Sequence, residues 1–164
     1  MIHFNNRPDS STLRIPLKVV RTRPRQPLTV VHLCQTFVGV DTHWWGGKTV
    51  PHTDESCTPC DRAVPLVWKG FVPIAPVADQ GRRGLLQITP LVVNQLNDEM
   101  MSKDGICGLV ARYSRFGNRI NSPLTIEILE RIKPPTVYSE DRVKAIVAAL
   151  FRAKTIDDST LLTK

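Results

Sequence analysis

The sequence lacks several features that would define its class at once. None of its apolar runs approaches the roughly 20 residues needed to cross a bilayer, and the polar start MIHFNNRPDSS has no apolar signal segment. There is no internal repeat, no glycine loop with P-loop spacing, and no paired-carboxylate or Ser/His/Asp motif. These absences predict a cytoplasmic protein that is not an enzyme.

Acidic residues are scarce relative to basic ones. The chain has 15 Asp+Glu against 22 Lys+Arg, which gives a net charge of +7 at pH 7. Such an excess favours polyanionic partners, nucleic acid first, although many proteins carry it without one. A hydrophobic content of 41% over 164 residues is enough for one folded domain with a single core.

Hydrophobic periodicity predicts a mainly β protein. Strands are expected at 13–20, 28–40, 66–76, 85–88, 106–113 and 124–129, and helices at 90–102 and 139–154. Pro16 restricts the first strand to an edge or bulge, Gly39 suggests a bulge in the second, and Thr89 followed by Pro90 is typical of a helix start. This order fits an OB-fold-like Greek-key β-barrel with a helix between strands, although a generic α+β sheet would give the same pattern.

The domain organisation follows from these elements. We expect a flexible N-terminus at 1–11, a zinc-containing OB-like domain at 12–133, a C-terminal helix packed on it at 134–154, and a flexible tail at 155–164. The C-terminal helix has one apolar face, made of Val143, Ile146, Val147, Leu150 and Phe151.

Residues 41–65 form a proline-rich stretch with no sustained period, and we interpret it as a loop that needs a cross-link. It contains His43, His52, Cys57 and Cys60 within eighteen residues. Thiolates and imidazoles are the donors that tetrahedral zinc prefers, and a Cys-x-x-Cys turn directs two sulfurs at one point. The spacing therefore predicts a zinc site.

Other interpretations of these residues remain open. The Cys-x-x-Cys pair could be a redox pair, but CTPCDRAVP runs into proline and a strand instead of opening a helix. His32, Cys34 or Asp41 could replace one ligand, and Cys107 is expected to be a small buried hydrophobe. Two histidines and two cysteines close the coordination shell, so a structural ion is favoured over a catalytic one, and the His-x-Glu motif of zinc deaminases is absent.

Aromatic and basic residues are interleaved in the way that single-strand binding requires, with rings for base stacking and cations for phosphates. Trp68 and Phe71 lie in a predicted strand, where an aromatic side chain more often belongs to the core than to a binding surface. The candidate nucleic-acid-binding residues are Trp44, Trp45, Lys48, Trp68, Lys69, Phe71, Arg82, Arg83, Arg112, Tyr113, Arg115, Phe116 and Arg119.

The runs HWWGGKTVP, CTPC, VPLVWKGFV and GLVARYSRFGNRINSPLTIEIL carry a resemblance. They resemble small zinc-containing OB-fold single-stranded DNA-binding proteins of bacteria and mobile elements. More loosely they are similar to the core of T4-type phage single-strand DNA-binding proteins, where one histidine and three cysteines hold zinc. The similarity covers about residues 28–130; His52 stands where a cysteine would be expected, and no acidic C-terminal tail is present.

The resemblance implies a non-catalytic protein that binds single-stranded DNA in replication, recombination or mobile-element biology, with a structural zinc ion. No sequence motif distinguishes DNA from RNA, because individual contacts recognise the 2′-hydroxyl group. The alternative is a basic interaction or inhibitor protein that binds an acidic protein partner. No membrane partner is expected.

Overall fold

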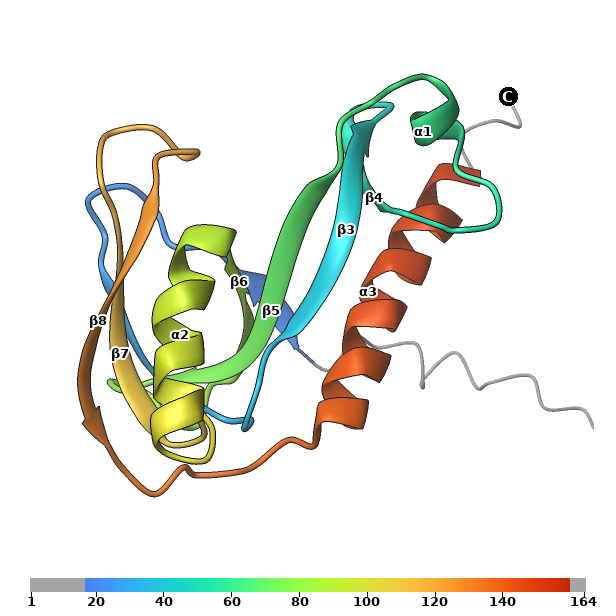
Figure 1. Cartoon of the computed structure of the whole chain (residues 1–164). Coiled ribbons are helices and arrows are strands. Elements are labelled where there is room, and N and C mark those ends of the chain that lie inside the picture. The colour runs from blue at the N-terminus through green and yellow to red at the C-terminus, as the bar shows by residue number, and fades with distance from the viewer. Residues whose placement is uncertain (1–16, 160–164) are drawn as a thin grey trace, which may run out of the picture.

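A computed structural model describes residues 17–159 of the chain, with side chains up to residue 152. The strands are β1 (Lys18–Val20), β2 (Leu28–His32), β3 (Val38–Trp45), β4 (Lys48–Pro51), β5 (Val67–Pro76), β6 (Gly84–Ile88), β7 (Leu109–Arg115) and β8 (Leu124–Arg131). The helices are α1 (Thr58–Asp61), α2 (Pro90–Ser102) and α3 (Glu140–Ser159) (Figure 1). The expected N-terminal segment 1–11, the start of the strand predicted at 13–20, and residues 160–164 of the expected tail lie outside the described range.

The strands form one mixed eight-stranded sheet in the order β1-β6-β5-β2-β7-β8, with β3 and β4 branching from β5. The long strand β5 pairs with β6 on one side and, in succession, with β3 and β2 on the other. The sheet is open, so the closed barrel expected from the sequence is not formed. The reason is local: β1 pairs in parallel with β6 and occupies the edge that a closing strand would need.

Both faces of the sheet are covered. Adjacent residues of one strand, such as Val30 and Val31 or Phe71 and Val72, belong to two different clusters of buried side chains. Since successive side chains point to opposite faces, a strand buried on both sides is apolar throughout. One cluster lies under α3 and the other under α2.

The two long helices agree with the sequence prediction. Thr89 is the N-cap residue of α2 and Pro90 follows in the first turn, as expected, but the Thr89 hydroxyl makes no capping hydrogen bond. The predicted apolar face of α3, formed by Val143, Ile146, Val147, Leu150 and Phe151, is buried. Phe151 meets Phe71 of β5 edge to face, with ring centroids 6.1 Å apart. The backbone of α3 continues to Ser159, beyond the predicted end at residue 154.

Two local predictions were wrong. The strand expected at 28–40 is two strands, β2 and β3, and Gly39 forms no bulge because it pairs in regular register with Gly70. The segment expected as an irregular loop contains a β-hairpin, β3–β4, closed by Gly46 and Gly47 with φ of 58° and 78°. Two successive positive φ angles are what a two-residue type I′ turn requires, and glycine adopts them without strain.

None of the helices within residues 17–159 combines the length and the apolar content that a membrane crossing requires.

Candidate metal centre and cationic cavity

The β3–β4 hairpin and the short helix α1 bring four potential metal ligands together. His43 lies on β3 and His52 directly follows β4, where its backbone N–H donates to the Asp41 carbonyl at 2.8 Å. Cys57 precedes α1 and Cys60 lies within it, so one helical turn places both sulfurs on the same side. The prediction that these four residues form one cluster is confirmed.

The donor atoms are spaced as a tetrahedral ion requires. All four lie within 4.8 Å of one another. His43 Nε2 lies 3.3 Å from Cys57 Sγ, 3.4 Å from Cys60 Sγ and 3.4 Å from His52 Nδ1, and Cys60 Sγ lies 3.4 Å from His52 Nδ1. Bonds of about 2.0 Å to nitrogen and about 2.3 Å to sulfur give tetrahedral edges of about 3.3 to 3.8 Å. The cluster could therefore hold a metal ion such as zinc.

Further partners orient both imidazole rings. The other ring nitrogen of His43, Nδ1, faces the Val64 carbonyl at 3.0 Å, so it carries the proton and Nε2 is left as a lone-pair donor. His52 Nε2 lies 3.5 Å from Asp54 Oδ1. That carboxylate favours a proton on Nε2 and leaves Nδ1 to face the two sulfurs. Both tautomers are therefore the ones that metal binding needs.

The two thiols have different proton affinities. Burial acts to raise the pKa of Cys57, but backbone hydrogen bonds from Cys60 and Thr53, together with the neighbouring side chains of His52 and Cys60, lower it to about 6. The pKa of Cys60 is raised, first by its hydrogen bond with Cys57 and then by burial. The site thus favours a thiolate at Cys57, and a divalent cation would favour one at both positions.

The proposed substitute ligands lie elsewhere. His32 is fully buried, with Nδ1 2.8 Å from the Leu109 carbonyl and Nε2 2.7 Å from the Tyr113 hydroxyl. Cys34 is buried in the core under α3, and none of His32, Cys34 or Asp41 belongs to the cluster. Cys107 is half-buried, not fully buried as expected, and burial raises the pKa of its thiol.

A cavity of about 630 Å³ opens where β5, β6, the start of α2 and the β7–β8 loop approach one another. We call it the tryptophan cavity, because Trp44 and Trp68 lie in its wall. Its charged lining residues are Arg21, Lys69 and Arg115, and none of the described residues that line it is Asp or Glu. A recess with cations and no carboxylate concentrates positive potential and attracts anions.

Trp68 is held by the sheet beneath it. A Cβ atom added at Gly39 would lie 2.6 Å from the indole, and one added at Gly70 would lie 2.5 Å from it. These two glycines are cross-strand partners. Because neither has a side chain, the indole ring packs closely against the backbone of both strands. Phe37 packs against the edge of Trp68, with ring planes at 88°. The glycine pair, not a bulge, is therefore the reason for glycine at position 39.

Arg115 connects two segments of the cavity wall. Its Nε–H donates to the Thr22 carbonyl at 2.8 Å, and its Nη1 donates to the Ser122 carbonyl in the β7–β8 loop. Burial and then the charge of Arg21 lower the pKa of the Arg115 guanidinium. The two guanidinium groups repel each other, and a bound anion would relieve that repulsion.

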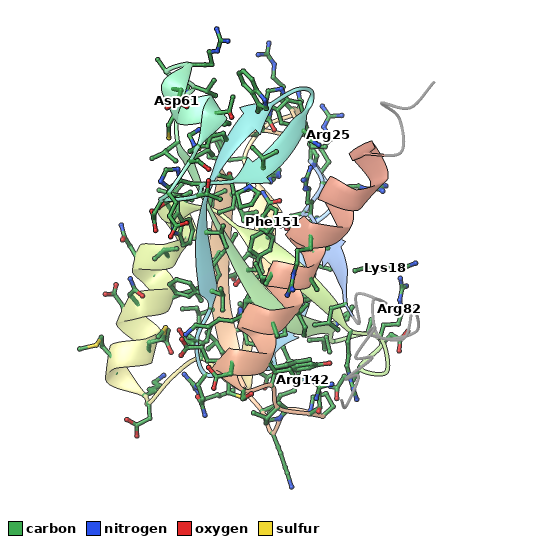
Figure 2. The ribbon with its side chains drawn as sticks, turned by 90° about the vertical axis from the view of Figure 1, so that its right-hand side faces the viewer. Lys18, Arg25, Asp61, Arg82, Arg142 and Phe151 are labelled. Carbon is green, nitrogen blue, oxygen red and sulfur yellow. The ribbon has the colours of Figure 1, made fainter. Side chains whose placement is uncertain are left out.

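The structure separates the predicted nucleic-acid-binding residues into groups. Trp44, Trp68, Lys69 and Arg115 line the tryptophan cavity. Trp45 and Lys48 flank the β3–β4 turn, and Phe116 and Arg119 lie in the β7–β8 loop. Arg112 is paired with Glu127 at 3.0 Å. Arg82 and Arg83 are exposed just before β6, and Figure 2 shows Arg82 on this flank.

Two of the predicted residues need correction. Phe71 is 2% exposed and Tyr113 is fully buried, so neither presents a ring face for stacking on a base. Phe71 points into the core under α3, and Tyr113 points into the opposite core, where its hydroxyl meets His32. At these two positions the strands are covered on both faces, so either orientation of the ring is a core orientation.

Sequence reasoning missed several residues of the cavity. Arg21, Thr49, Gln87, Ile120 and Asn121 line it as well. The basic run Arg21-Thr-Arg-Pro-Arg is a signal in the sequence, but only the fold shows that it borders the cavity. The remaining residues carry no motif, because they meet through the fold and not through their spacing in sequence.

The chain was also compared with known proteins. No protein-family model matches the sequence, and no similar sequence was found among curated proteins. Function is therefore inferred from the metal centre and the tryptophan cavity themselves.

Proposed function

We propose that this chain is a non-catalytic single-stranded nucleic-acid-binding protein, with DNA favoured over RNA, and that its metal is a structural zinc ion. The tryptophan cavity is the observation that carries the proposal. It combines two indole rings with Arg21, Lys69 and Arg115 and has no carboxylate among its described lining residues. Phosphates need the cations, and bases need the rings.

The aromatic rings favour an unpaired strand as the ligand. Trp44 is 64% exposed, and Ile120, which also lines the cavity, is 59% exposed. Large exposed apolar groups next to cations are suited to bases that are not already stacked within a duplex. Lys69, whose Nζ donates to Thr49 Oγ1 at 2.8 Å, provides positive charge beside the rings.

The metal centre supports the same proposal because one strand, β3, carries both a metal ligand and an aromatic residue of the cavity. His43 and Trp44 are consecutive residues of this strand, and both line the tryptophan cavity. A zinc ion held by four protein donors has no open position for a substrate, which is typical of structural sites. Zinc would hold the hairpin and α1 together and so fix the orientation of Trp44.

The connectivity of the strands is compatible with an OB-type fold whose barrel has remained open. β2 and β3 pair with β5, β5 pairs with β6, α2 follows β6, and β7 and β8 form the last antiparallel pair. This is the order in which OB folds place a helix between their third and fourth strands. It supports the resemblance to zinc-containing single-strand DNA-binding proteins of bacteria and mobile elements.

Fluorescence anisotropy with a labelled single-stranded oligonucleotide of about 16 nucleotides tests the proposal. We expect binding that weakens with salt, and a loss of about 5- to 150-fold for Trp44→Ala, because one base stack contributes about 1 to 3 kcal/mol. The control is Met101→Ala, which removes an exposed apolar side chain at the other end of α2. Absence of binding at low salt would refute the proposal and favour an acidic protein partner.

A further inference from the structure

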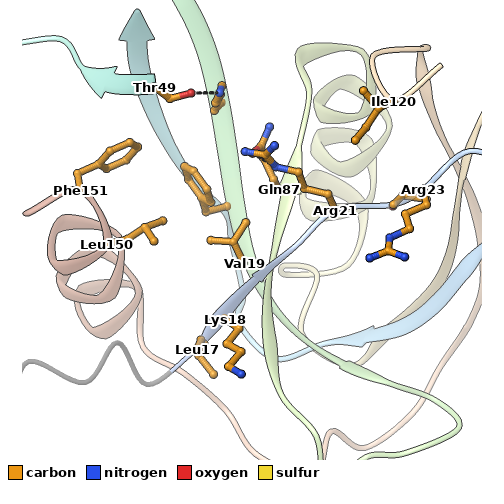
Figure 3. A pocket seen from close by; sticks show the side chains of 13 residues that line it. Leu17, Lys18, Val19, Arg21, Arg23, Thr49, Gln87, Ile120, Leu150 and Phe151 are labelled. Atoms are coloured by element: carbon orange, nitrogen blue, oxygen red, sulfur yellow. Dashed lines mark hydrogen bonds between the residues drawn. The ribbon is translucent and has the colours of Figure 1, made fainter. Parts of the chain in front are cut away.

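A second cavity of about 530 Å³ adjoins the tryptophan cavity (Figure 3). The two share five lining residues, Arg21, Thr49, Lys69, Gln87 and Ile120, so they lie side by side. We call the second one the β1 cavity, because Lys18 and Val19 of β1 lie in its wall. Arg21 stands at the junction, where its Nε–H donates to Gln87 Oε1 at 3.2 Å.

The β1 cavity has a basic side and an apolar floor. Lys18 and Arg23 are exposed and add to the charge of Arg21, and none of the described residues that line the cavity is Asp or Glu. Phe71 and Phe151 lie beneath this floor and are almost completely buried, so they offer no ring face to a base. Exposed cations without a neighbouring carboxylate are what the phosphates of a strand require.

Thr22 provides a separate indication of a missing partner. This residue lines the β1 cavity and is 2% exposed, yet its hydroxyl has no hydrogen-bond partner among the described residues. Buried polar groups are nearly always satisfied, so such a group calls for a partner.

We infer that a bound single strand continues past Arg21 from the tryptophan cavity into the β1 cavity, with its phosphates toward Lys18 and Arg23. This inference rests on the proposed function and defines the path of the ligand. Lys18 and Arg23 are five residues apart, and a fully extended chain of that length spans about 17 Å. This distance corresponds to several phosphate spacings along a nucleic-acid strand. Short strands fill only the tryptophan cavity, whereas longer ones fill both.

The test compares oligothymidylates of about 4 and about 16 nucleotides, the range of site sizes for such folds. The variant is Lys18→Ala/Arg23→Ala, and both residues are exposed, so we expect the fold to be retained. The control is Lys103→Ala/Lys133→Ala, which removes the same charge from exposed positions that line neither cavity. Thermal unfolding of each variant checks that the fold is intact.

We expect the variant to bind the long strand about tenfold more weakly and the short strand as the unmodified protein does. The slope of log K against log salt for the long strand should fall by about 1.4, because each lost phosphate contact removes about 0.7. If the variant behaves like the control, or loses affinity equally for both lengths, the proposed path is wrong. If the unmodified protein binds neither strand, the proposed function itself fails.

Discussion

Acidification from pH 7 to pH 4 should destabilise the protein through His32. This ring is completely buried, and its two nitrogens meet the Leu109 carbonyl and the Tyr113 hydroxyl. A carbonyl can only accept, so Nδ1 carries the proton and Nε2 accepts from Tyr113. Burial lowers the pKa of His32 to about 4; the hydrogen bond to Leu109 opposes this shift, and the charge of Arg131 adds to it.

The size of the effect follows from the difference between the two states. In the unfolded chain the pKa of a histidine is about 6.5, so the unfolded state takes up the proton first as the pH falls. The shift to about 4 in the folded protein corresponds to about 3 kcal/mol. The contribution of His32 to the free energy of unfolding is fully present above pH 6.5 and is lost as the pH falls from 6.5 to 4. It is a large part of the roughly 5 to 15 kcal/mol that typically stabilises a domain.

Urea unfolding at pH 7, 5.5 and 4 measures this contribution. The comparison is with His32→Leu/Tyr113→Phe, which replaces the ring and its hydroxyl partner by apolar groups. Other titrating groups, including the metal ligands, are common to both proteins and cancel in the comparison. Between pH 7 and pH 4 the unmodified protein should therefore lose about 3 kcal/mol more free energy of unfolding than the variant does. A difference that stays constant with pH, or a His32 ring that titrates near pH 6.5 by NMR, would refute the reasoning.

Three further predictions concern the metal centre and the glycines. Cys57→Ser/Cys60→Ser should reduce bound zinc from one ion per chain to none by elemental analysis, and should lower the midpoint of thermal unfolding by about 10 °C. Gly39→Ala should destabilise the protein by about 1 to 3 kcal/mol in urea unfolding and shift the tryptophan fluorescence. Gly81→Ala should do neither, because the one atom near its added Cβ, at 3.3 Å, is the end of the exposed Asp79 side chain, which can move away. Gly46→Ala should cost about 1 kcal/mol in the same assay, because φ at this position is 58°.

The metal cluster could be predicted from the sequence because its ligands are close along the chain. His43 to Cys60 spans eighteen residues, and the chemistry of the donors limits which ion they bind. What the sequence did not predict is the scaffold: a β-hairpin with a two-glycine turn instead of an irregular loop. Prolines and glycines indicate a turn, but pairing of His43 with Val50 is decided by the register of the hairpin.

The tryptophan cavity was only partly predictable, for a different reason. Its residues come from seven separate segments of the chain, and only the fold brings Arg21 of the β1–β2 segment next to Arg115 of β7. Phe71 and Tyr113 were misassigned because a strand buried on both faces gives no alternation by which an exposed aromatic side chain could be recognised. Residue type alone indicated the chemistry but not which side chains reach solvent.

The parallel strand β1 also determines how the sheet meets other molecules. Its three residues hydrogen-bond along β6 and so cover backbone N–H and C=O groups that a bare strand would offer to another chain. In a protein shortened past Val20, β6 with its apolar residues Leu85 and Leu86 would become an unpaired edge strand. Such a product would self-associate by strand pairing, so deletions intended to trim the N-terminal region should stop before Leu17.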